Sequence, residues 1–250
     1  MRARSNGIHI FAGLRHVSVP QPKHIQEWRR LSQLVFLIML PWVFLYIPPD
    51  HVVSALEVGR IDGGTVFRGV FVALAVVFGR VACGWICPWG TMQELCERTT
   101  NPNTKKIPPW IKYVFFFTWL ISVAVLMIHN KVRSFSFAFE PVPFDLFYLA
   151  LYFCMFAEVV FFCAWLGRRS ACKLCPLGAV MALASPFRRL KIAGDRDQCK
   201  QCRTCEKNCS MSLPITEQVR DGNLVKDFNC ILCGKCVESC PNGLLRYTFE

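Results

Sequence analysis

The chain has 250 residues, of which 53% are hydrophobic, and it nevertheless carries a formal net charge of +12. A soluble domain rarely combines a mean hydropathy of +0.33 with so many lysines and arginines, whereas apolar spans with basic flanks produce both. Because the basic residues lie beside apolar segments rather than on one periodic face, we expect no nucleic-acid partner.

Four apolar runs predict helices that cross a lipid bilayer, at residues 31–49, 65–82, 110–129 and 145–167. At 1.5 Å per residue the first run would span roughly 28 Å, close to the thickness of a bilayer core. Pro41 is expected to kink this run, which membrane helices tolerate. A fifth apolar stretch, 177–187, is too short to cross and is expected to lie at the interface.

The distribution of lysine and arginine predicts the orientation of these spans. Residues 1–30 contain six, 83–109 three and 168–191 six, whereas 50–64 contain one and 130–144 two. The positive-inside rule therefore predicts that both termini are cytoplasmic. We expect a basic N-terminal arm over 1–30 and a four-span membrane domain over 31–191.

Residues 192–250 carry the most specific pattern of the chain. One run is Cys199-x2-Cys202-x2-Cys205-x3-Cys209, and a second is Cys230-x2-Cys233-x2-Cys236-x3-Cys240-Pro241. Two such runs are typical of a ferredoxin with two [4Fe–4S] clusters, in which the fourth cysteine of each run ligates the other cluster. We expect one ligand set of Cys199, Cys202, Cys205 and Cys240, and another of Cys230, Cys233, Cys236 and Cys209. Zinc would need four ligands rather than eight in mirrored runs.

An internal repeat places further cysteines at the ends of the second and fourth runs. Gly79-Arg80 leads to Cys83-x3-Cys87-Pro88, and Gly167-Arg168 leads to Cys172-x2-Cys175-Pro176. The membrane part therefore resembles two helical hairpins that each end in a cytoplasmic Cys-Pro motif, and such repeats often share a site. The fold class expected for the whole chain is mainly α: a four-helix transmembrane bundle followed by a small α+β ferredoxin-type domain.

The four cysteines of these motifs admit three interpretations. They could hold a further metal or iron–sulfur centre, act as redox-active dithiols that exchange electrons with a metal or quinone, or be structural residues of a helix-ending turn. Arg80 and Arg168 precede the motifs, where a cation would lower a thiol pKa or stabilise an anionic semiquinone. Ordinary positive-inside flanking is the alternative explanation of both arginines.

One carboxylate lies within an apolar span. Glu158 costs about 2–3 kcal/mol at a bilayer centre, so it is a functional candidate. Arg68 lies at a similar distance before its own Cys-Pro motif, so we expect an Arg68–Glu158 pair that is structural or lines a quinone or proton site. The spans offer no central histidine, so we expect no haem.

These motifs together resemble a known family. Four spans, Cys83-Gly-Trp-Ile-Cys87-Pro88, Cys172-Lys-Leu-Cys175-Pro176 and the double-cluster module are similar to the NapH/MauN-type membrane-bound ferredoxins and to the membrane core of NosR-type regulators and CcoG-type copper reductases. The resemblance covers about residues 31–250. It implies a bacterial inner-membrane protein that moves electrons between the quinone pool and a partner oxidoreductase or its maturation machinery.

The function expected from the sequence is membrane-bound electron transfer, as a subunit that works with a partner oxidoreductase or a ferredoxin-type subunit. Two alternatives remain open. One is a metal reductase that delivers reduced copper or iron during assembly of another enzyme. The other is a redox sensor whose clusters report rather than transmit.

Overall fold

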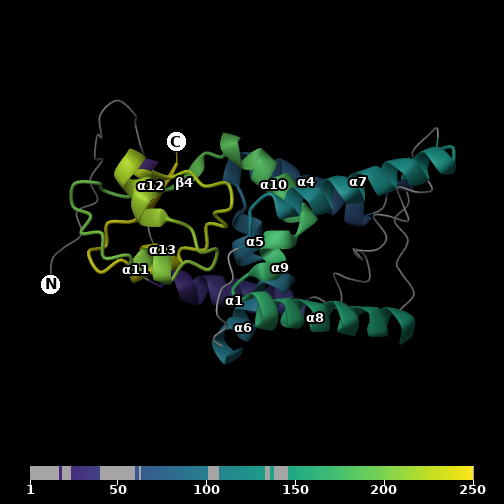
Figure 1. Ribbon diagram of the computed structural model, residues 1–250, viewed down its shortest axis with the longest axis horizontal. Helices are drawn as coiled ribbons and strands as arrows, with labels where there is room; N and C mark the ends of the chain where they lie inside the picture. The colour runs from purple at the N-terminus through teal and green to yellow at the C-terminus, as the bar shows by residue number, and fades with distance from the viewer. Residues whose placement is uncertain are drawn as a thin grey trace.

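The computed structural model describes residues 17–18, 24–39, 60–61, 63–100, 107–132, 136–137 and 146–249. A small module of strands and short helices lies at one end of the molecule, and long helices extend from it toward the other end (Figure 1). Between these parts lie four shorter helices: α5 (Val81–Trp85), α6 (Pro88–Thr100), α9 (Ser170–Leu174) and α10 (Pro176–Ala184). The fold is therefore mainly helical with a C-terminal module of the ferredoxin type, as the sequence predicts.

Three apolar helices form the long end of the molecule: α4 (Gly63–Phe78), α7 (Ile111–His129) and α8 (Leu146–Leu166). Within the described ranges only α7 is both long and apolar enough to cross a membrane, and just 11% of it is buried. Apolar side chains face outward on all three helices; Val70, Phe115 and Phe153 are each more than half exposed. The expected second, third and fourth runs thus form helices, while the complete four-span bundle stays a prediction.

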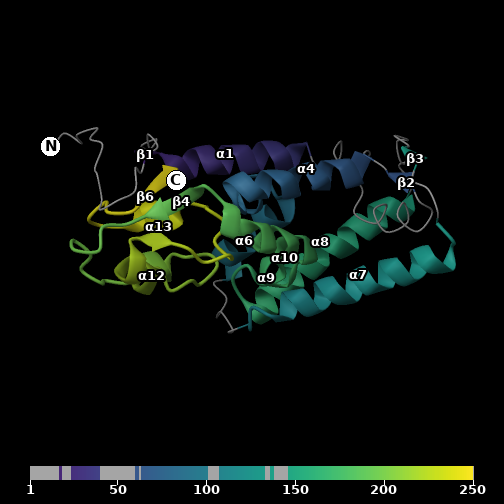
Figure 2. The same ribbon diagram turned by 90° about the horizontal axis from the view of Figure 1, so that it is seen from above.

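The helix of the first expected span, α1 (Ile25–Ile38), begins inside the segment expected to be an N-terminal arm. Its first half buries polar side chains, including Gln26 and Arg29, because α1 packs against α5, α6 and α13 (Lys235–Ser239) rather than standing apart (Figure 2). The rest of the expected span, residues 40–49 with Pro41, lies outside the described residues.

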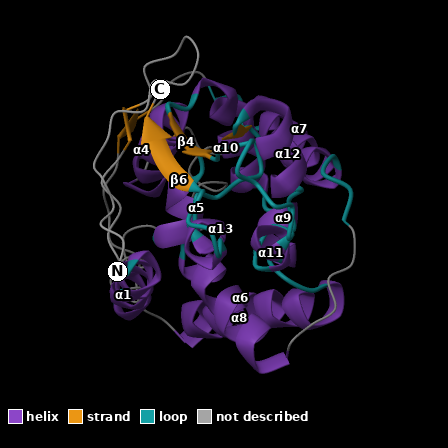
Figure 3. Cartoon of the chain, turned by 90° about the vertical axis from the view of Figure 1, so that its left-hand side faces the viewer, coloured by secondary structure: helices purple, strands orange, loops and turns teal. Residues whose placement is uncertain are grey.

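The C-terminal module is built on a four-stranded sheet in the order β1-β6-β4-β5. The strands are β1 (Val17–Ser18), β6 (Arg246–Phe249), β4 (Leu190–Ala193) and β5 (Leu224–Val225), and all pairings are antiparallel. Viewed from this end, the strands lie beside the short helices α11 (Thr204–Lys207), α12 (Ile215–Gly222) and α13 (Figure 3). Buried Ile192, Val219 and Tyr247 contribute to its core. Strand β1 therefore ties the N-terminal segment to the C-terminal sheet.

The two halves of the repeat have the same local structure. Helices α4 and α8 both end at a glycine with positive φ, +63° at Gly79 and +94° at Gly167, a conformation that favours glycine after a helix. A short helix follows, and then Pro88 or Pro176 begins a longer one, since proline is well accommodated in the first turn. The expected interfacial stretch forms α10 and the 3₁₀ helix η1 (Ser185–Phe187), and α10 packs on α4 and α7. A short parallel pair, β2 (Arg60–Ile61) with β3 (Ser136–Phe137), joins two distant segments.

Candidate functional site

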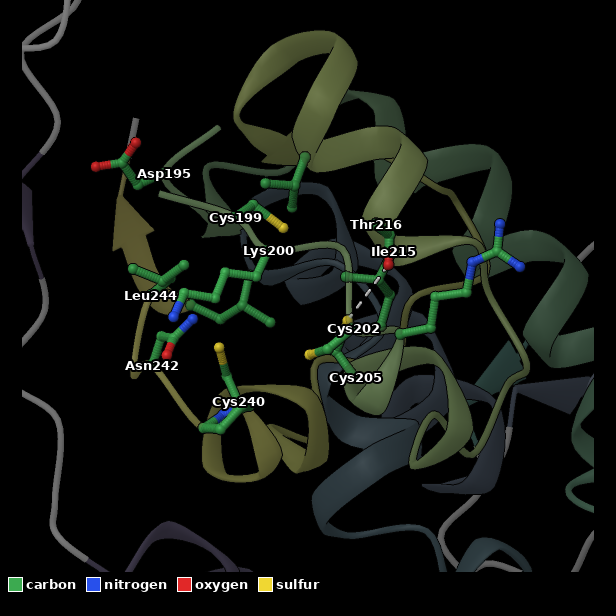
Figure 4. A pocket seen from close by; sticks show the side chains of 14 residues that line it. Asp195, Cys199, Lys200, Cys202, Cys205, Ile215, Thr216, Cys240, Asn242 and Leu244 are labelled. Atoms are coloured by element: carbon green, nitrogen blue, oxygen red, sulfur yellow. Dashed lines mark hydrogen bonds between the residues drawn. The ribbon is translucent and has the colours of Figure 1, made fainter. Parts of the chain in front are cut away.

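The first group of thiols surrounds a pocket at the outer end of the module. Its lining includes Cys199, Cys202, Cys205 and Cys240, which come from two separate segments and face a common space (Figure 4). Gln201 and Arg203 have positive φ values of +52° and +55°, and this backbone curls the loop around the pocket. The Thr204 hydroxyl donates to Cys202 Sγ at 3.5 Å. Cys202 is exposed, so this pocket reaches the surface.

A second group of thiols lines a separate pocket, and all four of its cysteines are buried: Cys209, Cys230, Cys233 and Cys236. Ile231 lines the pocket and is only 2% exposed, so an apolar side chain helps to keep water out. The Leu213 amide donates to Cys209 Sγ at 3.4 Å. Burial raises the pKa of Cys230 to about 12. In this pocket a bound cluster would be shielded from solvent, which tunes its potential.

Both pockets fit a cubane cluster in the composition of their donors. Each pocket is lined by three cysteines from one run and by the fourth cysteine of the other run. Cys240 thus lines the first pocket, and Cys209 lines the second. Among the described residues no three Cys, His, Asp or Glu side chains lie close enough to ligate a single ion. A cubane keeps its four thiolates further apart than one tetrahedral ion does, so these sets suit [4Fe–4S] ligation.

A third group of thiols, the Cys-Pro layer, lies between the helices and the module; its members are Cys83, Cys87, Cys172 and Cys175. Every pair within this group is close enough for electrostatic repulsion. Burial, reinforced by this repulsion, raises the pKa of Cys87 and Cys172 and raises that of Cys175 to about 11. Met181 Sδ lies 3.4 Å from Cys83 Sγ.

A pair of arginines interlocks the two halves of this layer. Arg80 and Arg169 are 1% and 0% exposed, and each lies three residues before the first cysteine of its motif. A Cβ added to Gly178 would lie 2.7 Å from Arg80 Nη2, and one added to Gly90 would lie 2.5 Å from Arg169 Nη1. Each of these glycines follows the proline of the opposite motif by two residues. Each hairpin thus leaves room for the arginine of the other.

Arg168, the arginine expected to lie beside the thiols of the second motif, points away from them. Its side chain donates to the Lys207 carbonyl at 3.0 Å in an exposed position. Its neighbour Arg169 takes the place beside the thiols, with φ at +52° and Nη1 at 4.0 Å from Cys172 Sγ. Alignment of the repeat on its first cysteine, rather than on the preceding glycine, is the sequence signal that identifies Arg169. Arg80 is found where the sequence predicts, and it donates to the Cys172 carbonyl at 3.4 Å.

The second pocket is docked directly onto the Cys-Pro layer. Gly84, next to Cys83, contacts the module so closely that an added Cβ would collide with the Ile231 carbonyl oxygen. The Trp85 indole donates to the Leu232 carbonyl at 3.1 Å. Cys172 belongs to the same buried cluster as the cysteines of the second pocket. The second pocket and the layer are therefore in direct protein contact.

A buried carboxylate, Glu94 on α6, stabilises this junction. It accepts two hydrogen bonds from Arg29 at 2.5 and 2.8 Å and one from Arg169 at 2.7 Å, and Lys235 lies 3.3 Å away. Burial alone would raise the pKa of Glu94, but the Arg29 hydrogen bonds and the charges of Arg169 and Lys235 outweigh it and hold the pKa far below its usual range. Sequence analysis missed Glu94, because nothing in the chain order predicts that α1, α9 and α13 meet at α6.

The expected pair between Arg68 and Glu158 is not formed. Helix α4 packs on α10 and η1, whereas α8 packs on α6 and α9, so equal depth does not bring the two side chains together. Glu158 is exposed on α8, and within the described part of the chain its carboxylate has no ion pair. Arg68 is half-buried on α4 and has an interaction of its own.

Comparisons with known proteins agree with this arrangement of thiols. The model of a 4Fe–4S dicluster domain matches residues 198–245, and that of a 4Fe–4S binding domain matches 63–106 and 148–193. The ferredoxin-type protein NapH of Haemophilus influenzae is 25% identical over 88% of this chain and 88% of its own length. The chain is therefore similar to the NapH-type membrane ferredoxins over most of its length.

Two further relatives extend the comparison. The putative electron transport protein YccM of Escherichia coli is 27% identical over 88% of this chain and 74% of its own length. An uncharacterized protein of Methanocaldococcus jannaschii is 26% identical over 90% of this chain and 87% of its own. No solved structure matches the chain. The resemblance found in the sequence is thereby confirmed, and the chain is an electron-transfer iron–sulfur protein.

Proposed function

We propose that this chain is a membrane-bound electron carrier that links the quinone pool to a partner oxidoreductase. The observation that carries the proposal is the close docking of the second pocket on the Cys-Pro layer, at Gly84 and Trp85. Electron transfer needs short distances through packed protein. This contact therefore supports a module that exchanges electrons with the Cys-Pro layer, rather than one that is only attached to the membrane domain.

The path runs through three groups of thiols. When bound, the [4Fe–4S] clusters supply one-electron carriers. Exposed Cys202 opens the first pocket to a redox partner, and the buried second pocket lies between the first pocket and the layer. The chain thereby shields its middle carrier from water and oxidants while it leaves the terminal one accessible.

For the membrane we propose the arrangement that the sequence predicts. Residues 31–191 would form four spans, the ferredoxin domain 192–250 would lie in the cytoplasm with both termini, and the membrane would be the bacterial inner membrane. The outward apolar faces of α4, α7 and α8 and the basic segments at 1–30 and 168–191 support this proposal. A reporter fused after residue 250 should be inaccessible to protease in intact spheroplasts and cleaved after lysis.

For the quinol we propose a site on the outward face of α8. Quinol oxidation releases protons with its electrons, and Glu158 offers an exposed carboxylate there that can accept one. Substitution Glu158→Gln should abolish quinol-dependent reduction, with Cys154→Ser on the same helix as the matched control. Full quinol-linked activity in Glu158→Gln would remove this role.

The test of the whole proposal is bleaching of the clusters by a quinol in membranes that contain the chain. Quinol-dependent reduction of both ferredoxin clusters is expected. Cluster-dependent Cu(II) reduction with no response to quinol would instead favour the metal reductase, for which the Met181–Cys83 sulfur pair is a suitable soft ligand set. Intact partner turnover after cluster removal, with altered gene expression, would favour a redox sensor.

A further inference from the structure

The Cys-Pro layer combines two features that neither ferredoxin pocket has together. Its four thiols come in equal numbers from the two hairpins, and two fully buried arginines flank them. Nε and Nη1 of Arg80 are buried without a hydrogen-bond acceptor in the described structure, whereas Nε of Arg169 makes no hydrogen bond but has Glu97 Oε1 at 3.8 Å. A buried guanidinium N–H without a partner is costly, so these groups indicate an anionic ligand that completes the site.

We propose that the two hairpins share one further iron–sulfur cluster, held by the four thiols of the Cys-Pro layer and neutralised by Arg80 and Arg169. The role of this cluster as an electron carrier rests on the proposed function. Its ligands and its binding do not. It selects one of the three interpretations that the sequence leaves open.

The number of ligands requires that the hairpins act together. Each of the two matches to the 4Fe–4S binding domain contains one Cys-Pro motif, and thus only two of the four thiolates that a cubane needs. The interlock of Arg80 with Gly178 and of Arg169 with Gly90 brings the two half-sites face to face. A single site of four thiolates results from two incomplete ones.

The geometry favours a multinuclear centre over a single ion. All six pairs of thiols lie within electrostatic range, yet no three of them meet the distances of one ion among the described residues. The Gly178 amide already donates to Cys175 Sγ at 3.5 Å, the kind of contact that stabilises a cluster thiolate. A zinc or copper site would need these sulfurs to converge further.

The charges of the site support the same assignment. Four thiolates around an oxidised [4Fe–4S]2+ core leave two net negative charges, and Arg80 and Arg169 supply two positive ones. Glu94 and Glu97 also pair with Arg169, but Arg29 lies 2.5 Å from Glu94 and Lys235 lies 3.7 Å from Glu97, so each carboxylate has a second counter-charge. A buried centre is therefore neutralised inside the protein, as a low-dielectric site requires.

The test is the iron and acid-labile sulfide content of the purified, anaerobically reconstituted full chain. We expect about twelve irons per chain, four beyond the eight of the two ferredoxin clusters. Cys83→Ser and Cys175→Ser should each remove about four irons and leave the other eight, while Cys154→Ser, the exposed control on α8, keeps twelve. Eight irons in the unmodified chain, with or without bound zinc or copper, would overturn the proposal.

The role of the two arginines is tested separately, by measuring the reduction potential of the additional cluster with potentiometric electron paramagnetic resonance. Arg169→Gln and Arg80→Gln should shift the potential of the additional signal to more negative values, because reduction adds a negative charge, and Arg→Lys at either position should restore much of the shift. No shift in either glutamine variant would contradict the role of the arginines. Neither measurement uses quinol or a partner, so a failed quinol assay and a failed iron count are distinguishable.

Discussion

The two ferredoxin pockets share a ligand pattern but differ in their surroundings. The first is open at Cys202, and its loop carries exposed basic residues such as Lys200 and Arg203. The second is lined by four buried cysteines and by apolar side chains such as Ile231 and Val225. On the proposed electron path, identical spacing in the sequence would therefore serve two roles, an accessible terminal carrier and a shielded middle carrier.

This difference arises from what each run contacts. The second run faces α1 and the Cys-Pro layer, where Gln26 donates to the Cys233 carbonyl at 2.8 Å and Tyr247 donates to the Leu232 carbonyl at 2.7 Å. The first run faces outward from the sheet. Substitutions that disturb the second pocket and leave the first pocket unchanged should therefore distinguish the two roles.

The largest effect is expected from loss of a buried ligand. Cys230→Ala should remove the second cluster and with it about four irons, and should stop transfer between the first cluster and the layer. Iron content and the rate of reduction of the first cluster by quinol measure the two consequences. Rapid reduction of the first cluster by quinol in this variant would show that the second pocket is not on the path.

A loss of about 3–5 kcal/mol in the free energy of unfolding is expected from Glu94→Gln, because buried Arg29 would lose its counter-charge and Arg169 would lose the nearer of its two carboxylates. Chemical denaturation in detergent measures it. Glu238→Gln, at an exposed position on the neighbouring α13, is the matched control and should cost less than about 0.5 kcal/mol. Equal losses in both variants would contradict the role assigned to the Glu94 junction.

Gly84→Ala should destabilise the junction by about 1–3 kcal/mol, because the new methyl group would push the Ile231 carbonyl and the second pocket away from α5. Slower electron transfer between the second cluster and the layer should accompany the loss, while the first cluster keeps its potential. Gly69→Ala, where no atom lies within 4 Å of the added Cβ, serves as the control. An unchanged rate of electron transfer in Gly84→Ala would show that transfer does not depend on the close contact between Gly84 and Ile231.

The pH dependence of stability should carry the signature of Glu94. Its pKa is lowered in the folded chain, so its contribution is fully present above the ordinary carboxyl pKa of about 4.3 and is lost as the pH falls toward the folded value. The difference in unfolding free energy between the unmodified chain and Glu94→Gln should therefore shrink below about pH 4. A difference that is constant with pH would mean that packing, not charge, accounts for the loss.

The smallest effect is expected at the exposed pocket. Thr204→Val removes the hydroxyl that donates to Cys202 Sγ, and should lower the potential of the first cluster by roughly 20–60 mV, the equivalent of one modest hydrogen bond. Thr204→Ser keeps the donor and should restore the potential. A shift of the second cluster instead would contradict the assignment of Cys202 to the first pocket.

Several features of the site could be predicted from spacing alone. The cysteines of each expected ligand set line one pocket, while their role as ligands stays a prediction, and the Cys-Pro motifs are neighbours, as their repetition indicates. Both depend on local geometry, in which short loops and prolines decide the backbone. The same spacing identifies Arg169 when it is counted back from the first cysteine of each motif, whereas counting from the preceding glycine selects Arg168.

What the sequence determined by itself is the chemistry: the clusters, the family and the apolar helices follow from residue types at fixed short spacing. Only the tertiary structure decided which groups share a space. In the folded chain Glu94 binds Arg29 and Arg169, and Gly84 contacts Ile231. Arg68 and Glu158 lie on helices that pack against different neighbours. The reason is physical: ligand spacing is a property of one loop, whereas burial and charge pairing depend on which helices pack together, and depth along a span does not reveal that.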